Sequence, residues 1–314
     1  MHDKSIKVLI VDDEKDFVEM LSLILREGGI SVTGVPGGNE CLELLDQEDF
    51  DVVILDVWMP GMNGIETLIN IKKNHPLVEV IMVTGHGSIQ DAIEAMKIGA
   101  FDFLLKPTDY EDLISKLTDA HIKKRKQEDR IAKAKIKNLT QESSEKEEEI
   151  ITSQQDVETK NESITKMVVP LKTAIKVLVV DDEKPFVELI SLRLQAAGAE
   201  VSIAFNGNEC LETLKQKVID IVILDFEMPG MGGVETLRKI KGEFPLVEVI
   251  VLTAHGTVET AVEGMRLGAY DYLLKPTDFK DLKSKLEGAG IRKKNQEFRM
   301  QKALTTEFAN YSFR

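Results

Sequence analysis

The sequence predicts two α/β domains, each built on a doubly wound parallel sheet. Short apolar runs alternate along the chain with longer segments in which apolar side chains have helical spacing. Strands that alternate with helices are typical of right-handed crossovers in a parallel sheet. The whole pattern then repeats later in the chain without an insertion or deletion, and 314 residues are enough for two domains of ordinary size.

Five apolar runs in the first half are bounded by turn residues, which predicts five strands. These runs lie at 6–11, 31–35, 52–55, 80–83 and 101–105. A helical pattern follows each of them; Gly28 and Gly99 mark helix ends, and Ser88 is the expected N-cap of the fourth helix. Five parallel strands separated in this way fit the flavodoxin-like order 2-1-3-4-5.

The second half repeats this arrangement from Ile175 to about Arg292. We therefore predict domains at 1–124 and 173–292, a charged connector at 125–172 and a C-terminal tail at 293–314. The connector is basic at first and acidic later, and its apolar residues do not sustain the heptad of a coiled coil. Two interpretations of the connector stay open. It is either a solvated, partly helical tether or a helical spacer that sets the distance between domains or pairs two chains.

Composition narrows the classes of partner and location. The net charge of −14 argues against nonspecific binding to nucleic acid or to anionic membranes. No apolar run reaches the roughly 18 residues needed to span a bilayer, and the N-terminus lacks the apolar core of a signal peptide, so we expect a cytoplasmic protein. Cys41 and Cys210 occupy equivalent positions of the repeat, which indicates a small buried site used twice.

Polar residues stand where the predicted strands end. Asp12 and Asp13 follow the first strand, Asp56 follows the third, and the fourth and fifth lead to Thr84 and Lys106. The set recurs at one constant displacement, as Asp181, Asp182, Asp225, Thr253 and Lys275. A lone strand-end aspartate is more often the cap of a turn. The full set, repeated at the sheet edge where α/β proteins bind ligands, favours a functional site in each half.

In order and spacing, this set resembles the receiver domains of response regulators in two-component signalling. The resemblance covers both halves and leaves out the start, the middle and the end of the chain. It implies that Asp56 and Asp225 accept a phosphoryl group from a phosphohistidine on a sensor histidine kinase or a histidine phosphotransfer protein. It also implies that Lys106 and Lys275, with Thr84 and Thr253, contact the phosphoryl oxygens.

Three carboxylates at one sheet edge repel one another unless some are protonated or a cation joins them. Mg²⁺ suits such a site because it prefers oxygen ligands and keeps several waters. The resemblance implies direct ligation by Asp13 and Asp56, a water-mediated contact from Asp12, and a contact from the backbone carbonyl of Trp58. The equivalent Mg²⁺ ligands in the second half are Asp182, Asp225, Asp181 and the backbone carbonyl of Glu227.

Phe103 and Tyr272 stand three residues before the lysines and resemble the aromatic switch of the family, although an ordinary core role fits them equally well. The resemblance also implies cis bonds before Pro107 and Pro276. His255 follows Thr253 by two residues and is expected to have a structural role in its loop.

We expect a tandem receiver protein whose output passes through a downstream protein partner or a phosphorelay. Slow self-dephosphorylation is expected, rather than the turnover of a dedicated enzyme. Two alternatives stay open. In the first, one receiver is an unphosphorylated module for scaffolding or for dimerisation into a homodimer. In the second, the chain is a phosphatase with an aspartyl nucleophile, in which only Glu227 stands where a general acid is needed.

Overall fold

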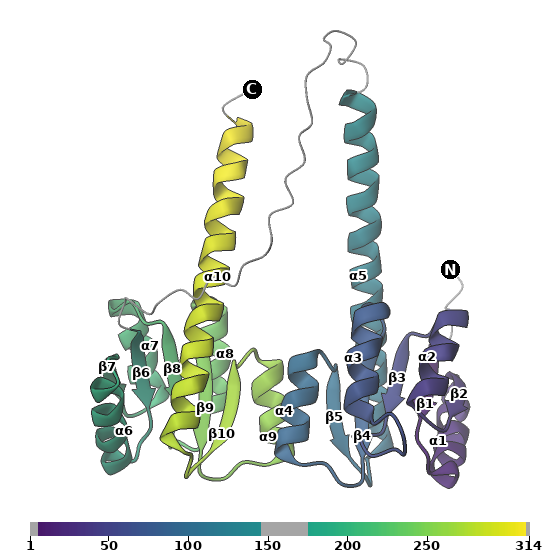
Figure 1. The fold of residues 1–314 in the computed structure, drawn as a ribbon, viewed down its shortest axis with the longest axis horizontal. Helices are drawn as coiled ribbons and strands as arrows, with labels where there is room; N and C mark the ends of the chain where they lie inside the picture. The colour runs from purple at the N-terminus through teal and green to yellow at the C-terminus, as the bar shows by residue number, and fades with distance from the viewer. Residues whose placement is uncertain (1–5, 146–174, 312–314) are drawn as a thin grey trace. The chain divides into compact units, whose positions relative to one another are not determined.

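The computed structural model describes residues 6–145 and 175–311, with the side chains of 135–145 and 304–311 left out. Figure 1 shows two parallel sheets with helices packed against them. Residues 146–172 of the predicted connector and the last three residues of the tail lie outside the described residues.

The first sheet has five parallel strands in the order β2-β1-β3-β4-β5, which confirms the predicted fold class. The strands are β1 (Lys7–Val11), β2 (Ser31–Val35), β3 (Val52–Leu55), β4 (Glu79–Thr84) and β5 (Asp102–Leu105). β3 and β4 are buried along their whole length, as expected for central strands covered on both faces.

Five helices connect and follow these strands. They are α1 (Lys15–Glu27), α2 (Gly38–Gln47), α3 (Gly64–Asn74), α4 (Ile89–Ile98) and α5 (Tyr110–Glu145). Ser88 caps α4 through a reciprocal capping box with Asp91, and Gly99 ends this helix at φ 116°, a conformation that glycine adopts without a steric penalty. Both predicted signals are therefore confirmed.

The second sheet repeats the same topology, as β7-β6-β8-β9-β10. Its strands are β6 (Lys176–Val180), β7 (Glu200–Ala204), β8 (Ile221–Leu224), β9 (Glu248–Thr253) and β10 (Asp271–Leu274). Its helices are α6 (Lys184–Ala196), α7 (Gly207–Gln216), α8 (Gly233–Glu243), α9 (Val258–Arg266) and α10 (Phe279–Tyr311).

The core of the second domain lies on both faces of its sheet. On one face, strand side chains pack with α6 and α10; the helical contributors include Val187, Ile190, Leu194, Leu282 and Leu286. On the other face, they pack with α7, α8 and α9, including Cys210, Leu214, Leu237, Ile240 and Ala261. Consecutive residues of one strand, Val177 and Leu178, belong to opposite faces, as the two-residue period of a strand requires.

Cys41 and Cys210 are both fully buried and free, in agreement with the predicted core role. Burial in apolar surroundings raises the pKa of each thiol to about 12. Among the described residues, the structure contains no helix that is both long and apolar enough to span a membrane.

The last helix of each domain extends well beyond its sheet (Figure 1). α5 has 36 residues and α10 has 33, so the predicted boundaries at residues 124 and 292 fall inside continuous helices. Within α5, Lys124 donates to the carbonyl of Phe50 at 2.6 Å and to Asp51 Oδ1 at 3.2 Å. The first part of the predicted connector is thus helical and directly continuous with a helix that is anchored to the domain.

The same anchor recurs in the second domain. Lys293 of α10 donates to the carbonyl of Ile219 at 3.0 Å and to Asp220 Oδ1 at 2.7 Å. Gly288 and Gly290 do not interrupt α10. The hydroxyl of Tyr270 occupies the space where a side chain at position 288 would begin, so Gly288 permits close packing of the Tyr270 side chain, just before β10, against the helix.

Candidate functional site

Strand register brings the predicted site residues of each domain to one edge of its sheet. Val11 pairs with Leu55, so Asp12 and Asp56, the next residues on their strands, lie side by side. In the second domain Val180 pairs with Leu224, which does the same for Asp181 and Asp225. All of these residues follow the carboxyl ends of parallel strands, the edge at which open α/β sheets bind ligands.

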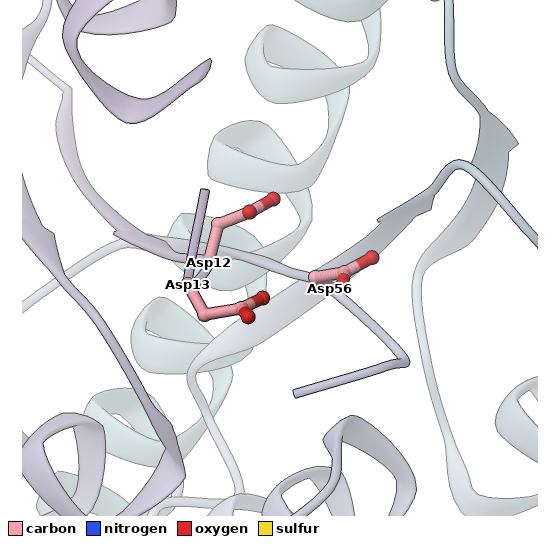
Figure 2. Close-up of side chains that lie close together, drawn as sticks. All are labelled: Asp12, Asp13 and Asp56. Carbon is pink, nitrogen blue, oxygen red and sulfur yellow. The ribbon is translucent and has the colours of Figure 1, made fainter. Parts of the chain in front are cut away.

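The first carboxylate cluster consists of Asp12, Asp13 and Asp56, and one carboxylate oxygen from each lies within 4.8 Å of those of the other two. Figure 2 shows Asp12 and Asp13 adjacent on one segment and Asp56 next to them on another. Asp12 and Asp56 are buried and Asp13 is exposed. Backbone amides fix the two buried groups: Glu14 N–H donates to Asp12 Oδ1 at 2.9 Å, and Trp58 N–H donates to Asp56 Oδ2 at 3.2 Å.

The second carboxylate cluster, Asp181, Asp182 and Asp225, has the same burial pattern and the same limit of 4.8 Å. Lys275 reaches into it and donates to Asp225 Oδ2 at 2.9 Å and to Asp181 Oδ2. Burial raises the pKa of Asp181, and the hydrogen bond from Lys275 offsets only part of this effect. Burial disfavours the charge of Lys275, but its bonds to Asp181 and Asp225 outweigh burial and raise the lysine pKa.

The two predicted threonines end their strands beside the carboxylates. Thr84 and Thr253 are buried, and the carbonyl oxygen of each accepts from the backbone N–H of the following strand's lysine, Lys106 or Lys275. The hydroxyl of Thr253 is buried without a hydrogen-bond partner among the described residues. Since a buried hydroxyl normally has a partner, this one is suited to a group that arrives during function.

Phe103 and Tyr272 are both buried, with exposed fractions of 3% and 1%. The Tyr272 hydroxyl lies 2.9 Å from Thr260 Oγ1, and its ring packs edge-on against Phe226 with centroids 5.7 Å apart. Asp91 stands at the position equivalent to Thr260 in the first domain. The structure thus records the inward orientation of both aromatics, which is compatible with either predicted role. The peptide bonds before Pro107 and Pro276 are cis, as the resemblance implied.

The loops beside the two sites differ. In the second domain, His255 Nδ1 lies 2.8 Å from Glu227 Oε2, which joins the loop after β8 to the loop after β9. The equivalent residues in the first domain are Trp58, which is 61% exposed, and His86. The carboxylate of Glu227, which the phosphatase alternative needs as a general acid, is therefore held by a histidine in this structure.

Sequence reasoning missed one contact of the site lysine. The ammonium of Lys275 lies 4.2 Å from the ring centroid of Phe186, in the first turn of α6. Phe17 occupies the equivalent position in the first domain. The recurrence of a phenylalanine at this position of the repeat was the sequence signal that could have drawn attention to it.

The residues of both clusters fit a divalent cation. Each offers three carboxylates with oxygens close enough to share one ion, and oxygen is the donor that Mg²⁺ prefers. Burial raises the pKa of Asp181 by more than its bond to Lys275 lowers it, so a further cation would favour the charged form of this carboxylate. Asp13 and Asp182 are exposed, so an ion can reach each cluster from solvent.

A comparison with protein families matches one model, the response regulator receiver domain, at residues 8–118 and again at 177–287. The transcriptional regulatory protein ZraR of Escherichia coli strain K12 is 41% identical over 115 residues, which cover 37% of this chain and 26% of ZraR. The putative response regulator NtrX-like of Rickettsia bellii is 37% identical over 139 residues, which cover 43% of this chain and 29% of the relative.

Among solved structures, the CheY-like receiver domain protein of Methanospirillum hungatei JF-1 is 28% identical, with a TM-score of 0.38; the match covers 40% of this chain and 99% of that one. The chain spans less than a third of the length of the two curated relatives described above. Because ZraR is named as a transcriptional regulator, the expectation that this chain has no nucleic-acid partner gains no support from the comparison and stays a prediction.

Proposed function

The chain belongs to the response-regulator receiver family and carries two receiver domains, from which we propose that each domain accepts a phosphoryl group on an aspartate, Asp56 or Asp225. The observation that supports this most directly is the surroundings of Asp225. This carboxylate is buried at a strand end, and the Lys275 ammonium lies 2.9 Å from it. On the same sheet edge lies the buried hydroxyl of Thr253, which has no hydrogen-bond partner within the part of the chain that the structure describes.

The proposed reaction is a nucleophilic displacement at phosphorus. A carboxylate oxygen of the acceptor forms a bond to phosphorus while the bond between phosphorus and a ring nitrogen of the donor's phosphohistidine breaks, and the donor histidine is released. Catalysis then depends on positioning and on neutralising the charge of the phosphoryl oxygens.

We propose that Asp12, Asp13 and Asp56 hold Mg²⁺ in the first domain, together with the backbone carbonyl of Trp58. Asp181, Asp182, Asp225 and the backbone carbonyl of Glu227 do so in the second. When bound, Mg²⁺ neutralises the crowded carboxylates and one phosphoryl oxygen. Lys275 remains to pair with a second phosphoryl oxygen and the Thr253 hydroxyl to donate to a third; Lys106 and Thr84 have these roles in the first domain.

The donor we propose is a sensor histidine kinase or a histidine phosphotransfer protein, and the output passes to a downstream protein or along a phosphorelay. The inward orientation of Phe103 and Tyr272 supports a read-out in which these rings respond to movement of the site threonines, Thr84 and Thr253. We expect slow self-dephosphorylation instead of steady turnover, because the chain's own groups at the acceptor serve to bind the phosphoryl group.

The test is to count phosphoryl groups on each domain. The full chain, Asp56→Ala and Asp225→Ala are incubated with Mg²⁺ and acetyl phosphate and analysed by intact mass. Two groups on the wild type and one on each variant are expected, while Asp46→Ala, an exposed residue of α2, should still accept two. Steady release of inorganic phosphate that requires Glu227 would support the phosphatase instead. A single group, lost in only one variant, would support the scaffold alternative.

A further inference from the structure

We propose that Phe186 is a positioning residue for phosphoryl transfer in the second domain, because its ring face holds the Lys275 ammonium at the acceptor. This inference rests on the proposed phosphoacceptor function. The ammonium lies 4.2 Å from the ring centroid, well inside the roughly 6 Å within which a cation is attracted to the negative face of an aromatic ring.

The environment of Lys275 explains why such a contact matters. Its side chain is only 10% exposed, so the attraction acts where water screens little. Two of its partners, Asp181 and Asp225, are the carboxylates that the proposed function assigns to the cation and the phosphoryl group. Their bonds to Lys275 therefore weaken when the cation and the phosphoryl group are bound. The third anionic neighbour, Glu183, is 3.9 Å away and 62% exposed, and pairs of this kind contribute little.

An aromatic ring at this position attracts the lysine in a way that a carboxylate at the same position could not. It attracts the ammonium without accepting its N–H groups in strong hydrogen bonds, so these remain able to donate to a phosphoryl oxygen. It also adds no negative charge to a site that already holds three carboxylates. Phe186 itself is fixed by the first turn of α6 and packs against the core of the domain, so the ring stays in place when the carboxylates are engaged.

The partial exposure of the Phe186 side chain distinguishes the proposed positioning role from core packing. Phe186 is only partly buried, and its neighbour Val187 is the fully buried contact of the same helix turn. The first domain carries Phe17, also partly buried, at the equivalent position of the repeat. We therefore extend the inference to Phe17 and Lys106.

The contact is tested first without metal or phosphoryl donor. The full chain is labelled with ¹³C at lysine Cε, and the Lys275 resonance is assigned by its absence in Lys275→Ala. The ring should shift this resonance upfield, and the shift should disappear in Phe186→Leu, which keeps an apolar side chain without a π face, and persist in Phe186→Tyr. A Lys275 resonance at the position of exposed lysines in the wild type would overturn the contact itself, even if Phe186→Leu failed to fold.

Function is tested in an Asp56→Ala background, in which only Asp225 can be phosphorylated, with Mg²⁺ and acetyl phosphate. Phe186→Leu should slow phosphorylation about fivefold, equal to about 1 kcal/mol of lost transition-state stabilisation, and Phe186→Tyr should restore the rate to within about twofold of wild type. Phe205→Leu is the matched control, because this ring lies 5.6 Å from Lys184 instead of the site lysine, and it should leave the rate unchanged.

A Phe186→Leu rate equal to wild type, or a Phe186→Tyr rate as slow as that of Phe186→Leu, would overturn the positioning role. In the Asp225→Ala background, Phe17→Leu should slow phosphorylation of Asp56 by a similar factor, and an unchanged rate would overturn the extension to the first domain. Absence of phosphorylation in the parent chain would overturn the proposed function instead, and the resonance of Lys275 would still decide whether the contact exists.

Discussion

Replacing Lys293 by methionine should destabilise the second domain and leave the first unaffected. The Lys293 side chain is 8% exposed and joins α10 to the segment before β8 through the carbonyl of Ile219 and the carboxylate of Asp220. Methionine keeps the length and apolar stem of lysine but removes its charge and donors. The substitution thus leaves a buried carbonyl without its partner and a carboxylate without its cation.

The magnitude follows from these two partners. Removing one member of a fully buried ion pair costs about 3–5 kcal/mol, and a hydrogen bond to a charged group contributes about 1.5–3 kcal/mol. Asp220 is 29% exposed and also accepts from the backbone N–H of Lys176 at 2.8 Å, so water and this bond compensate part of the loss. We therefore expect the free energy of opening of the second domain to fall by about 2–3 kcal/mol.

Hydrogen exchange followed by mass spectrometry of peptides measures this free energy separately in each domain of the full chain. The first domain, with its own anchor at Lys124, is the internal control. Lys294→Met changes an exposed neighbour and should alter exchange by less than about 0.5 kcal/mol. Combining Lys293→Met with Asp220→Asn should cost less than the sum of the two single changes. An effect of Lys293→Met no larger than that of Lys294→Met would refute the conclusion that Lys293 anchors α10 to the domain.

Two further predictions concern packing and pH. Gly288→Ala should destabilise the second domain by about 1–3 kcal/mol in the same exchange experiment, in spite of the higher helix propensity of alanine, because the new Cβ meets the Tyr270 hydroxyl. Gly290→Ala meets only the end of a flexible side chain and should be neutral or stabilising; equal effects would contradict this reasoning. Stability should also fall between pH 9 and about 12, by up to about 1.4 kcal/mol per pH unit for each of Cys41 and Cys210, because each thiol ionises in the unfolded chain before it does in the folded one. Urea titrations over this range should show a shallower decline when both are replaced by alanine, and identical slopes would argue against the raised pKa values.

The sequence determined the fold class of this protein and the positions of its two carboxylate clusters. Apolar runs that lead to Asp12, Asp56, Thr84 and Lys106 place four polar side chains of three kinds at one sheet edge, because parallel strands all end in the same direction. The repeat presents each of these positions twice, at one constant displacement. The helix signals at Ser88 and Gly99 were equally readable, since capping depends on residues close together in the chain.

Only the tertiary structure decided the contacts between residues far apart in the sequence. Lys275 meets Phe186, Glu227 meets His255, and Lys293 meets Asp220 through side chains whose reach and rotamers no local pattern specifies. The same holds for Gly288. Its low helix propensity predicts that it destabilises α10, whereas the structure shows that a larger side chain there would meet the Tyr270 hydroxyl. Local sequence fixes where a strand or helix begins and ends, whereas the partner of a side chain depends on which elements pack together and at what distance.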